Sequence, residues 1–295
     1  MDRETPKNVS IAEASLDYEP PSTPTRSETS EGPFDRGWRE IGSGRINAVA
    51  TVQRTEVVAC LGSSSTAGQG QAFGWIDELA SRPQNARFVF KNLGVGGDFA
   101  FDALKRVSAV VATQPDRIVI LIGANDVLAM VFPNVQRFLG GFMKRHPQPP
   151  SLAWFKENLA AILTQLKAGT NARIALSSLG PIGEAPESTD PHQHRSNDLI
   201  AQFSTTIQEA ASQYGTAYIP FHEKLSAAIA ASPGKALTAF RFLPIYADTL
   251  RYYALRQTSD QIAAVNGWKF HVDGVHLNRR GGMILAGLVQ EFLDS

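Results

Sequence analysis

The sequence has little cysteine and no long apolar run. Cys60 is the only cysteine among 295 residues, so no disulfide can form within the chain. We expect it to act as a small buried hydrophobe rather than as a nucleophile. No run of about 18 apolar residues occurs, and we therefore expect no membrane span. The first residues lack a basic region followed by an apolar stretch, so we expect no signal peptide and a cytoplasmic protein.

Neither sign of charge dominates the composition. The chain has 28 acidic and 28 basic residues, a balance that gives no indication of a nucleic acid or an anionic membrane as partner. Its hydrophobic content of 43% is ample for a sizeable core. The composition therefore predicts a globular domain without a nucleic-acid partner.

The first 54 residues differ from the rest. They hold proline-rich and serine-rich stretches, such as Pro20-Pro21-Ser22-Thr23-Pro24, and few large apolar residues. This composition is typical of a disordered or loosely packed segment. We expect a polar tail over residues 1–54 and one catalytic domain over residues 55–295.

From residue 55 onward, short apolar runs alternate with helical patterns. The predicted strands are 57–61, 88–91, 117–122, 173–177 and 217–219, and the predicted helices are 72–81, 99–112, 153–168, 192–214, 221–231 and 281–293. Strands joined by helices indicate an α/β protein, a three-layer α/β/α sandwich around a parallel sheet of about five strands.

Small and polar residues gather where the predicted strands end. The stretches are Gly62-Ser63-Ser64-Ser65-Thr66-Ala67-Gly68, Gly94-Val95-Gly96-Gly97-Asp98, Gly123-Ala124-Asn125-Asp126 and, before the last helix, Asp273-Gly274-Val275-His276. Ligands of open parallel sheets bind at the carboxyl ends of the strands. We therefore expect these stretches to meet in one site.

In this order the stretches resemble the blocks of the SGNH hydrolases, also called the GDSL esterase/lipase family. The first resembles G-D-S-x-T-x-G, Gly97 matches the glycine of the second block, and the last two match G-x-N-D and D-x-x-H. Ser63 replaces the usual Asp, and Leu277 replaces a Pro that often follows the His. The resemblance implies a flavodoxin-like sheet and a serine hydrolase of small-molecule carboxylic esters that uses neither cofactor nor metal.

The residue types fit that chemistry. A serine hydroxyl such as that of Ser64 needs an adjacent base, and His276 is the candidate base. Asp273, three residues earlier, is placed to accept from the same imidazole and to hold its tautomer. The resemblance assigns the oxyanion hole to the N–H groups of Ser64 and Gly97 and to the side-chain amide of Asn125.

Other readings of these motifs stay open. An α/β-hydrolase elbow, G-x-S-x-G, would need a final glycine where Thr66 stands. A metal site at His192 and His194 would need further ligands at useful spacing. There are two alternative classes of function. One is a non-catalytic binding module on the same fold, and the other is a protein that acts through its tail.

The substrate also stays open between a small or apolar acyl group, an O-acetylated carbohydrate, an acyl thioester and a lysophospholipid. Two aromatic-rich segments, 127–150 and 233–270, adjoin Asn125 and Asp273 in the sequence. We predict that they form the walls or lid of an acyl pocket. The alternative is that they are ordinary core helices.

Overall fold

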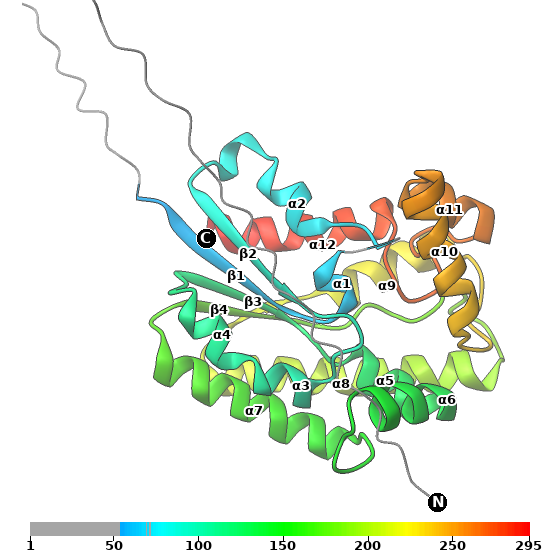
Figure 1. The fold of residues 1–295 in the computed structure, drawn as a ribbon, viewed down its shortest axis with the longest axis horizontal. Helices are drawn as coiled ribbons and strands as arrows, with labels where there is room; N and C mark the ends of the chain where they lie inside the picture. Colours follow the sequence, from blue (N-terminus) through cyan, green and yellow to red (C-terminus); the bar gives the residue numbers. More distant parts are fainter. Residues whose placement is uncertain (1–53, 69, 71) are drawn as a thin grey trace, which may run out of the picture. The chain divides into compact units, whose positions relative to one another are not determined.

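The computed structural model describes residues 54–68, 70 and 72–295 (Figure 1). The predicted polar tail therefore lies, apart from Arg54, outside the described residues.

In the part of the chain that the structure describes, five parallel strands form one sheet in the order β2-β1-β3-β4-β5. They are β1 (Glu56–Gly62), β2 (Phe88–Gly94), β3 (Arg117–Leu121), β4 (Arg173–Ser177) and β5 (Ala217–Ile219). Every residue of the central β3 is buried, as its unbroken apolar run requires, whereas the edge strand β2 is half exposed. The predicted α/β/α sandwich with flavodoxin-like strand order is confirmed.

Helices cover both faces of the sheet (Figure 1). One layer holds α2 (Trp75–Ala80), α9 (Phe221–Ala231) and α12 (Arg279–Asp294), with the 3-10 turn η1 (Pro83–Asn85) after α2. The other holds α3 (Ala100–Lys105), α4 (Val107–Ala112), α7 (Leu152–Gly169) and α8 (Pro191–Tyr214).

Local sequence signals set several of these helix ends. Ser151 Oγ accepts from the N–H of Trp154 at the start of α7, and Asn278 Oδ1 accepts from Gly281 at the start of α12. Helix α8 begins with Pro191 at its first position and ends at Gly215 in the left-handed conformation.

Two predicted helices have different bounds. The helix expected at 72–81 begins only at Trp75, and the preceding Phe73 donates its N–H to the main-chain oxygen of Leu277. The helix expected at 99–112 is broken at Arg106. There the guanidinium turns to bond the main-chain oxygens of Leu93 and Gly62, at the ends of β2 and β1.

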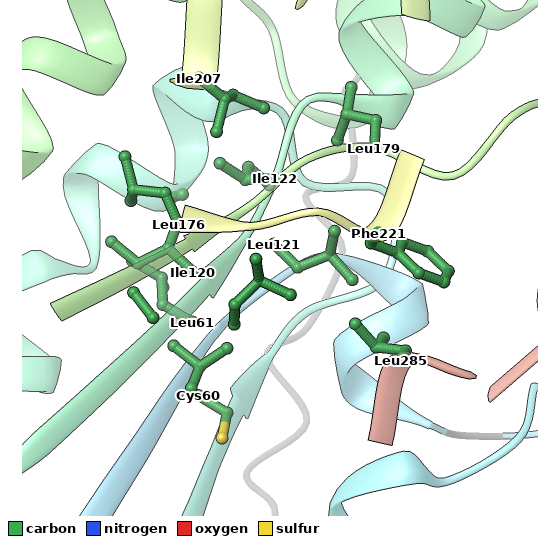
Figure 2. Close-up of a cluster of buried hydrophobic side chains, with 14 of the residues drawn as sticks. Cys60, Leu61, Ile120, Leu121, Ile122, Leu176, Leu179, Ile207, Phe221 and Leu285 are labelled. Carbon is green, nitrogen blue, oxygen red and sulfur yellow. The ribbon is translucent and has the colours of Figure 1, made fainter. Parts of the chain in front are cut away.

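The core fills the space between the sheet and both helical layers. Figure 2 shows side chains of β1, β3 and β4 packed with residues of the covering helices, among them Leu285 of α12 and Ile207 of α8. Cys60 is fully buried in this cluster, and burial raises the pKa of its thiol. It is placed as a core hydrophobe and not as a nucleophile.

The two aromatic-rich segments form extra helices at the carboxyl edge of the sheet (Figure 1). Residues 127–150 include most of α5 (Ala124–Val131), with α6 (Pro133–Val135) and the π-helix η2 (Gln136–Met143), and residues 233–270 include α10 (Phe242–Leu255) and α11 (Ser259–Asn266). Phe132 and Trp268 are buried, as the core-helix alternative expects, but Phe142, Tyr246 and Tyr253 are exposed. None of the helices in the described residues is both long and apolar enough to cross a membrane.

Candidate active site

Ser64 is presented by a tight turn at the end of β1. The strand stops at Gly62, and Ser64 is the first residue of the one-turn helix α1 (Ser64–Ala67). A Cβ at Gly62 would collide with the side chain of Thr66 and the main-chain oxygen of Leu121, so only glycine fits. The turn therefore holds the Ser64 side chain at the carboxyl edge of the central strands.

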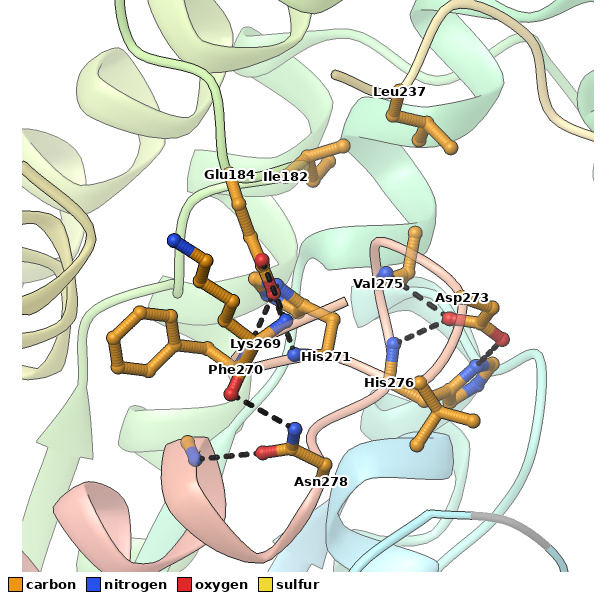
Figure 3. Close-up of polar contacts among 12 residues, drawn as sticks. Ile182, Glu184, Leu237, Lys269, Phe270, His271, Asp273, Val275, His276 and Asn278 are labelled. Carbon is orange, nitrogen blue, oxygen red and sulfur yellow. Dashed lines mark hydrogen bonds and ion pairs between the residues drawn. The ribbon is translucent and has the colours of Figure 1, made fainter. Parts of the chain in front are cut away.

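His276 and Asp273 lie next to Ser64, although they are more than 200 positions away in the chain. His276 Nε2 lies 3.0 Å from Ser64 Oγ, and His276 Nδ1 lies 2.6 Å from Asp273 Oδ2. The other carboxylate oxygen of Asp273 accepts from the N–H groups of Val275 and His276, at 3.0 and 2.8 Å (Figure 3). The structure thus joins the three residues in one line of hydrogen bonds.

The charges and hydrogen bonds of Asp273 and His276 shift the pKa of each group in the direction opposite to burial. Burial alone raises the pKa of Asp273, but the imidazole of His276 and the two N–H donors lower it to about 2. Burial lowers the pKa of His276, but the charge and hydrogen bond of Asp273 raise it above its ordinary value. Asp273 is therefore ionised at neutral pH and favours a proton on the ring.

Gly97 and Asn125 come together beside the Ser64 turn. β2 and β3 flank β1, with Gly94 and Leu121 both paired to Gly62, so the three loops leave the sheet side by side. Gly97 has a φ of 75°, a conformation that favours glycine. Asn125 Nδ2 donates at 2.9 Å to the main-chain oxygen of Asp98, the residue after Gly97. One amide group thus holds the loop that carries the Gly97 N–H.

A buried ion cluster supports the same loop. The carboxylate of Asp98 contacts Arg106 at 2.6 Å and Lys144 at 2.5 Å, and it is 1% exposed. Lys144 follows η2, so this contact ties the aromatic-rich segment to the Gly97 loop. The sequence analysis did not assign either cation. A lysine and an arginine far apart in the chain give no local signal that they share one carboxylate.

A comparison with protein-family models identifies the family of this chain. The model of the GDSL-like lipase/acylhydrolase family matches residues 60–281, which include Ser64, Gly97, Asn125, Asp273 and His276. The chain belongs to this family. It is therefore an ester hydrolase by family, and the resemblance noted in the sequence is confirmed. No curated protein matches the sequence.

Solved structures of hydrolases share the fold. The acetylxylan esterase Axe2 from Geobacillus stearothermophilus is 18% identical, with a TM-score of 0.53 over 81% of this chain and 94% of that one. The acetyl xylan esterase AlAXEase is 19% identical (TM-score 0.52, 80% and 99% covered). LAE5, an alpha/beta hydrolase enzyme from the metagenome of Lake Arreo, Spain, is 16% identical (TM-score 0.52, 81% and 94% covered). At these identities the likeness concerns the fold.

In this GDSL-like hydrolase a second carboxylate, Glu184, holds the loop that leads to Asp273 and His276 (Figure 3). Glu184 is fully buried and accepts from the N–H groups of Lys269, Phe270 and His271 at 2.6–2.8 Å, and its Oε1 lies 3.0 Å from His271 Nδ1. Burial alone raises the pKa of Glu184, but these contacts, that with His271 foremost, lower it below its usual range. The sequence analysis gave His271 no role and did not single out Glu184.

The remaining candidate residues have structural partners. Asp126 is buried, and its carboxylate accepts from the N–H of Ala100 at 3.1 Å, which braces the start of α3. Burial raises the pKa of Asp126 to about 8. His192 stacks on Phe132, and His194 pairs with Asp198. Across the described part of the chain, no group of three His, Cys, Asp or Glu side chains is placed to hold a metal ion.

Proposed function

We propose that this chain hydrolyses carboxylic esters by a serine mechanism through an acyl-enzyme intermediate. The observation that carries the proposal is the line of hydrogen bonds from Ser64 Oγ through the His276 ring to Asp273. A serine that donates to an imidazole, itself oriented by a buried carboxylate, is the arrangement that activates a hydroxyl at neutral pH.

The first half of the reaction forms the acyl-enzyme. Ser64 Oγ attacks the ester carbonyl carbon while its proton passes to His276 Nε2. The N–H groups of Ser64 and Gly97 and the amide of Asn125 donate to the oxyanion. Collapse of the tetrahedral intermediate breaks the bond to the alcohol, which leaves with the proton from His276.

The second half releases the acid. Water attacks the acyl carbonyl carbon and gives a proton to His276 Nε2. The new tetrahedral intermediate uses the same donors, and its collapse returns the proton to Ser64 Oγ. Asp273 keeps its charge throughout and stabilises the imidazolium that forms in each half.

For the acyl part we propose a small or apolar group. Leu139 of η2 supports this, because it lies against Gly97, where a Cβ would be 3.4 Å from its side chain. A pocket of about 540 Å³ on the Asp273 side is lined by the second aromatic-rich segment. Leu237, Phe240 and Trp268 lie in its wall beside the charged side chains of Lys235, Arg241 and Asp248. The competing substrate is an O-acetylated carbohydrate, because two of the structural neighbours are acetylxylan esterases.

Covalent labelling tests the mechanism. We expect a fluorophosphonate probe to label the protein, and Ser64→Ala to abolish both labelling and most ester hydrolysis. His276→Ala should have a similar effect, and the double variant should lose little more, because the two residues act as one unit. Ser65→Ala is the matched control and should keep its labelling. Unchanged hydrolysis in the Ser64→Ala variant would rule the mechanism out.

A further inference from the structure

Helix α10 buries one polar residue, Asp248, and exposes an apolar face. Leu243, Tyr246, Leu250 and Tyr253 follow one another at spacings of three and four, so they share one face of the helix. All four are exposed, Leu243 by 79%, whereas Asp248 is 1% exposed. A helix that packs on a core shows the opposite arrangement. Folding of the described residues therefore does not explain this face.

Polar contacts hold the helix in this orientation. Asp248 accepts from Arg251 Nη1 at 2.9 Å and from Asn266 Nδ2 at 2.7 Å. Asn266 Nδ2 also donates to the main-chain oxygen of Val272 at 3.0 Å. A buried carboxylate without partners destabilises the folded state. Turning the helix over would separate Asp248 from its partners and would therefore destabilise the fold. The outward direction of the apolar face is thus built into the fold.

A second exposed apolar patch continues this face. On η2, Phe142 is 75% exposed and Met143 is also exposed. The ring of Phe138 lies between the two helices, 6.3 Å from the Phe142 ring and 4.6 Å from the Phe242 ring at the start of α10. We call the joined surface the apolar rim. It consists of Phe142, Met143, Leu243, Tyr246, Leu250 and Tyr253.

The exposed charges in the two segments that carry the apolar rim have one sign. Over residues 133–150 and 241–256 the exposed charged side chains are those of Arg137, Arg145, Arg241 and Arg256. The one carboxylate in these ranges is that of Asp248, which is buried and paired. A neutral protein thus carries a locally cationic and apolar surface.

The elements that carry the apolar rim adjoin the candidate active site. Leu139 of η2 lies against Gly97. Asn266, which holds Asp248 of α10, also donates to the main-chain oxygen of Val272, the residue before Asp273.

We propose that the apolar rim docks this protein on an anionic lipid surface. Leucine and phenylalanine side chains fit the boundary between headgroups and acyl chains, tyrosines fit the headgroup level, and arginines bind lipid phosphates. A second copy of the chain fits less well, because a two-fold interface would set the arginines of both copies against each other. The docking goes beyond the proposed hydrolysis and does not depend on it.

Vesicle sedimentation with the full chain carrying Ser64→Ala tests the docking without turnover. We expect the protein to sediment with phosphatidylglycerol vesicles and to bind phosphatidylcholine vesicles about tenfold less. Binding should weaken in about 0.5 M NaCl, where charges more than about 5 Å apart are screened. Equal binding to both lipids, or to neither, would overturn the proposal.

A pair of double variants locates the surface. Leu243→Glu with Leu250→Glu places two charges on the apolar rim and should lower binding by about tenfold or more. Gln165→Glu with Ala168→Glu adds the same charge to the exposed face of α7 and should bind as the parent does. All four side chains are exposed, so thermal unfolding should change little in either variant. Equal binding by the two variants would overturn the proposal. The proposal would also be overturned if the parent formed a dimer and bound no vesicles, and if the rim variant dissociated that dimer.

Discussion

The side-chain amide of Asn125 donates a 2.9 Å hydrogen bond to the main-chain oxygen of Asp98. The bond connects the start of α5, which follows β3, to the loop after β2, one residue past Gly97. An amide nitrogen has two hydrogens, so Asn125 retains a second donor when the first holds the loop. One residue can therefore both position the N–H of Gly97 and bind the oxyanion itself.

Replacing Asn125 by Ala should lower kcat by roughly 10²–10³, with little change in KM, because the donor acts mainly in the transition state. Steady-state kinetics on a p-nitrophenyl ester measures both constants. Asn158→Ala is a matched control, since Asn158 is a buried amide that also donates to a main-chain oxygen, within α7. It should leave kcat nearly unchanged. If Asn125→Ala raised KM alone, the residue would belong to substrate binding.

Hydrolysis should fall on the acidic side, because His276 must be neutral to accept the serine proton. Asp273 raises the pKa of His276, so the midpoint of this fall in kcat/KM should lie above pH 6.5. Asp273→Asn removes that effect and should move the midpoint to lower pH while lowering kcat by about 10⁴. Profiles measured from about pH 4 to about pH 9 test both points. A wild-type profile flat down to about pH 4 would exclude a histidine base.

Glu184→Gln should lower the free energy of unfolding by about 2–4 kcal/mol, because an amide cannot accept from all the N–H donors that surround this carboxylate. The pKa of Glu184 is lowered in the folded state. The ionised carboxylate therefore stabilises the fold above pH 4.5, the pKa of the group in the unfolded chain. This stabilisation is lost as the pH falls below that value. Urea unfolding at neutral and at acidic pH measures the difference. Glu187→Gln, at an exposed position, should cost nothing measurable.

A series of p-nitrophenyl esters from acetate to decanoate tests the acyl group. Each buried methylene contributes ~0.8 kcal/mol, so kcat/KM should rise over the first few methylenes and stop where the pocket ends. Leu139→Ala should reduce the rise and leave acetate nearly unaffected, whereas Met143→Ala, at an exposed position of the same helix, should change neither. A steady fall from acetate onward would favour a deacetylase.

Local patterns in the sequence predicted the sheet well. The strands Arg173–Ser177 and Ala217–Ile219 have the predicted bounds. β1 is one residue longer at each end than expected, and β2 runs three residues further, to Gly94. Short apolar runs between turn residues specify buried parallel strands through local burial alone. The helix break at Arg106 could not be read this way, because its cause is a side chain that bonds to two other strand ends.

The candidate site also combines residues that the sequence shows with contacts that it does not show. Ser64, Gly97, Asn125, Asp273 and His276 stand in short blocks whose order and spacing show in the sequence. The supporting contacts do not show there, since Glu184 meets His271 across 87 positions and Lys144 meets Asp98 across 46. Such pairs depend on which loops the sheet brings to one edge.

The chain by itself determined the fold class, the family and the residues proposed for catalysis, because apolar periodicity and contiguous motifs act over a few residues. Its overall charge balance indicated no anionic partner. Only the tertiary structure decided which side of α10 faces outward. The spacing of Leu243, Tyr246, Leu250 and Tyr253 fits a helix with either side buried. Burial of Asp248 against Asn266 fixes the orientation and leaves the apolar side chains in solvent, next to arginines from two distant segments.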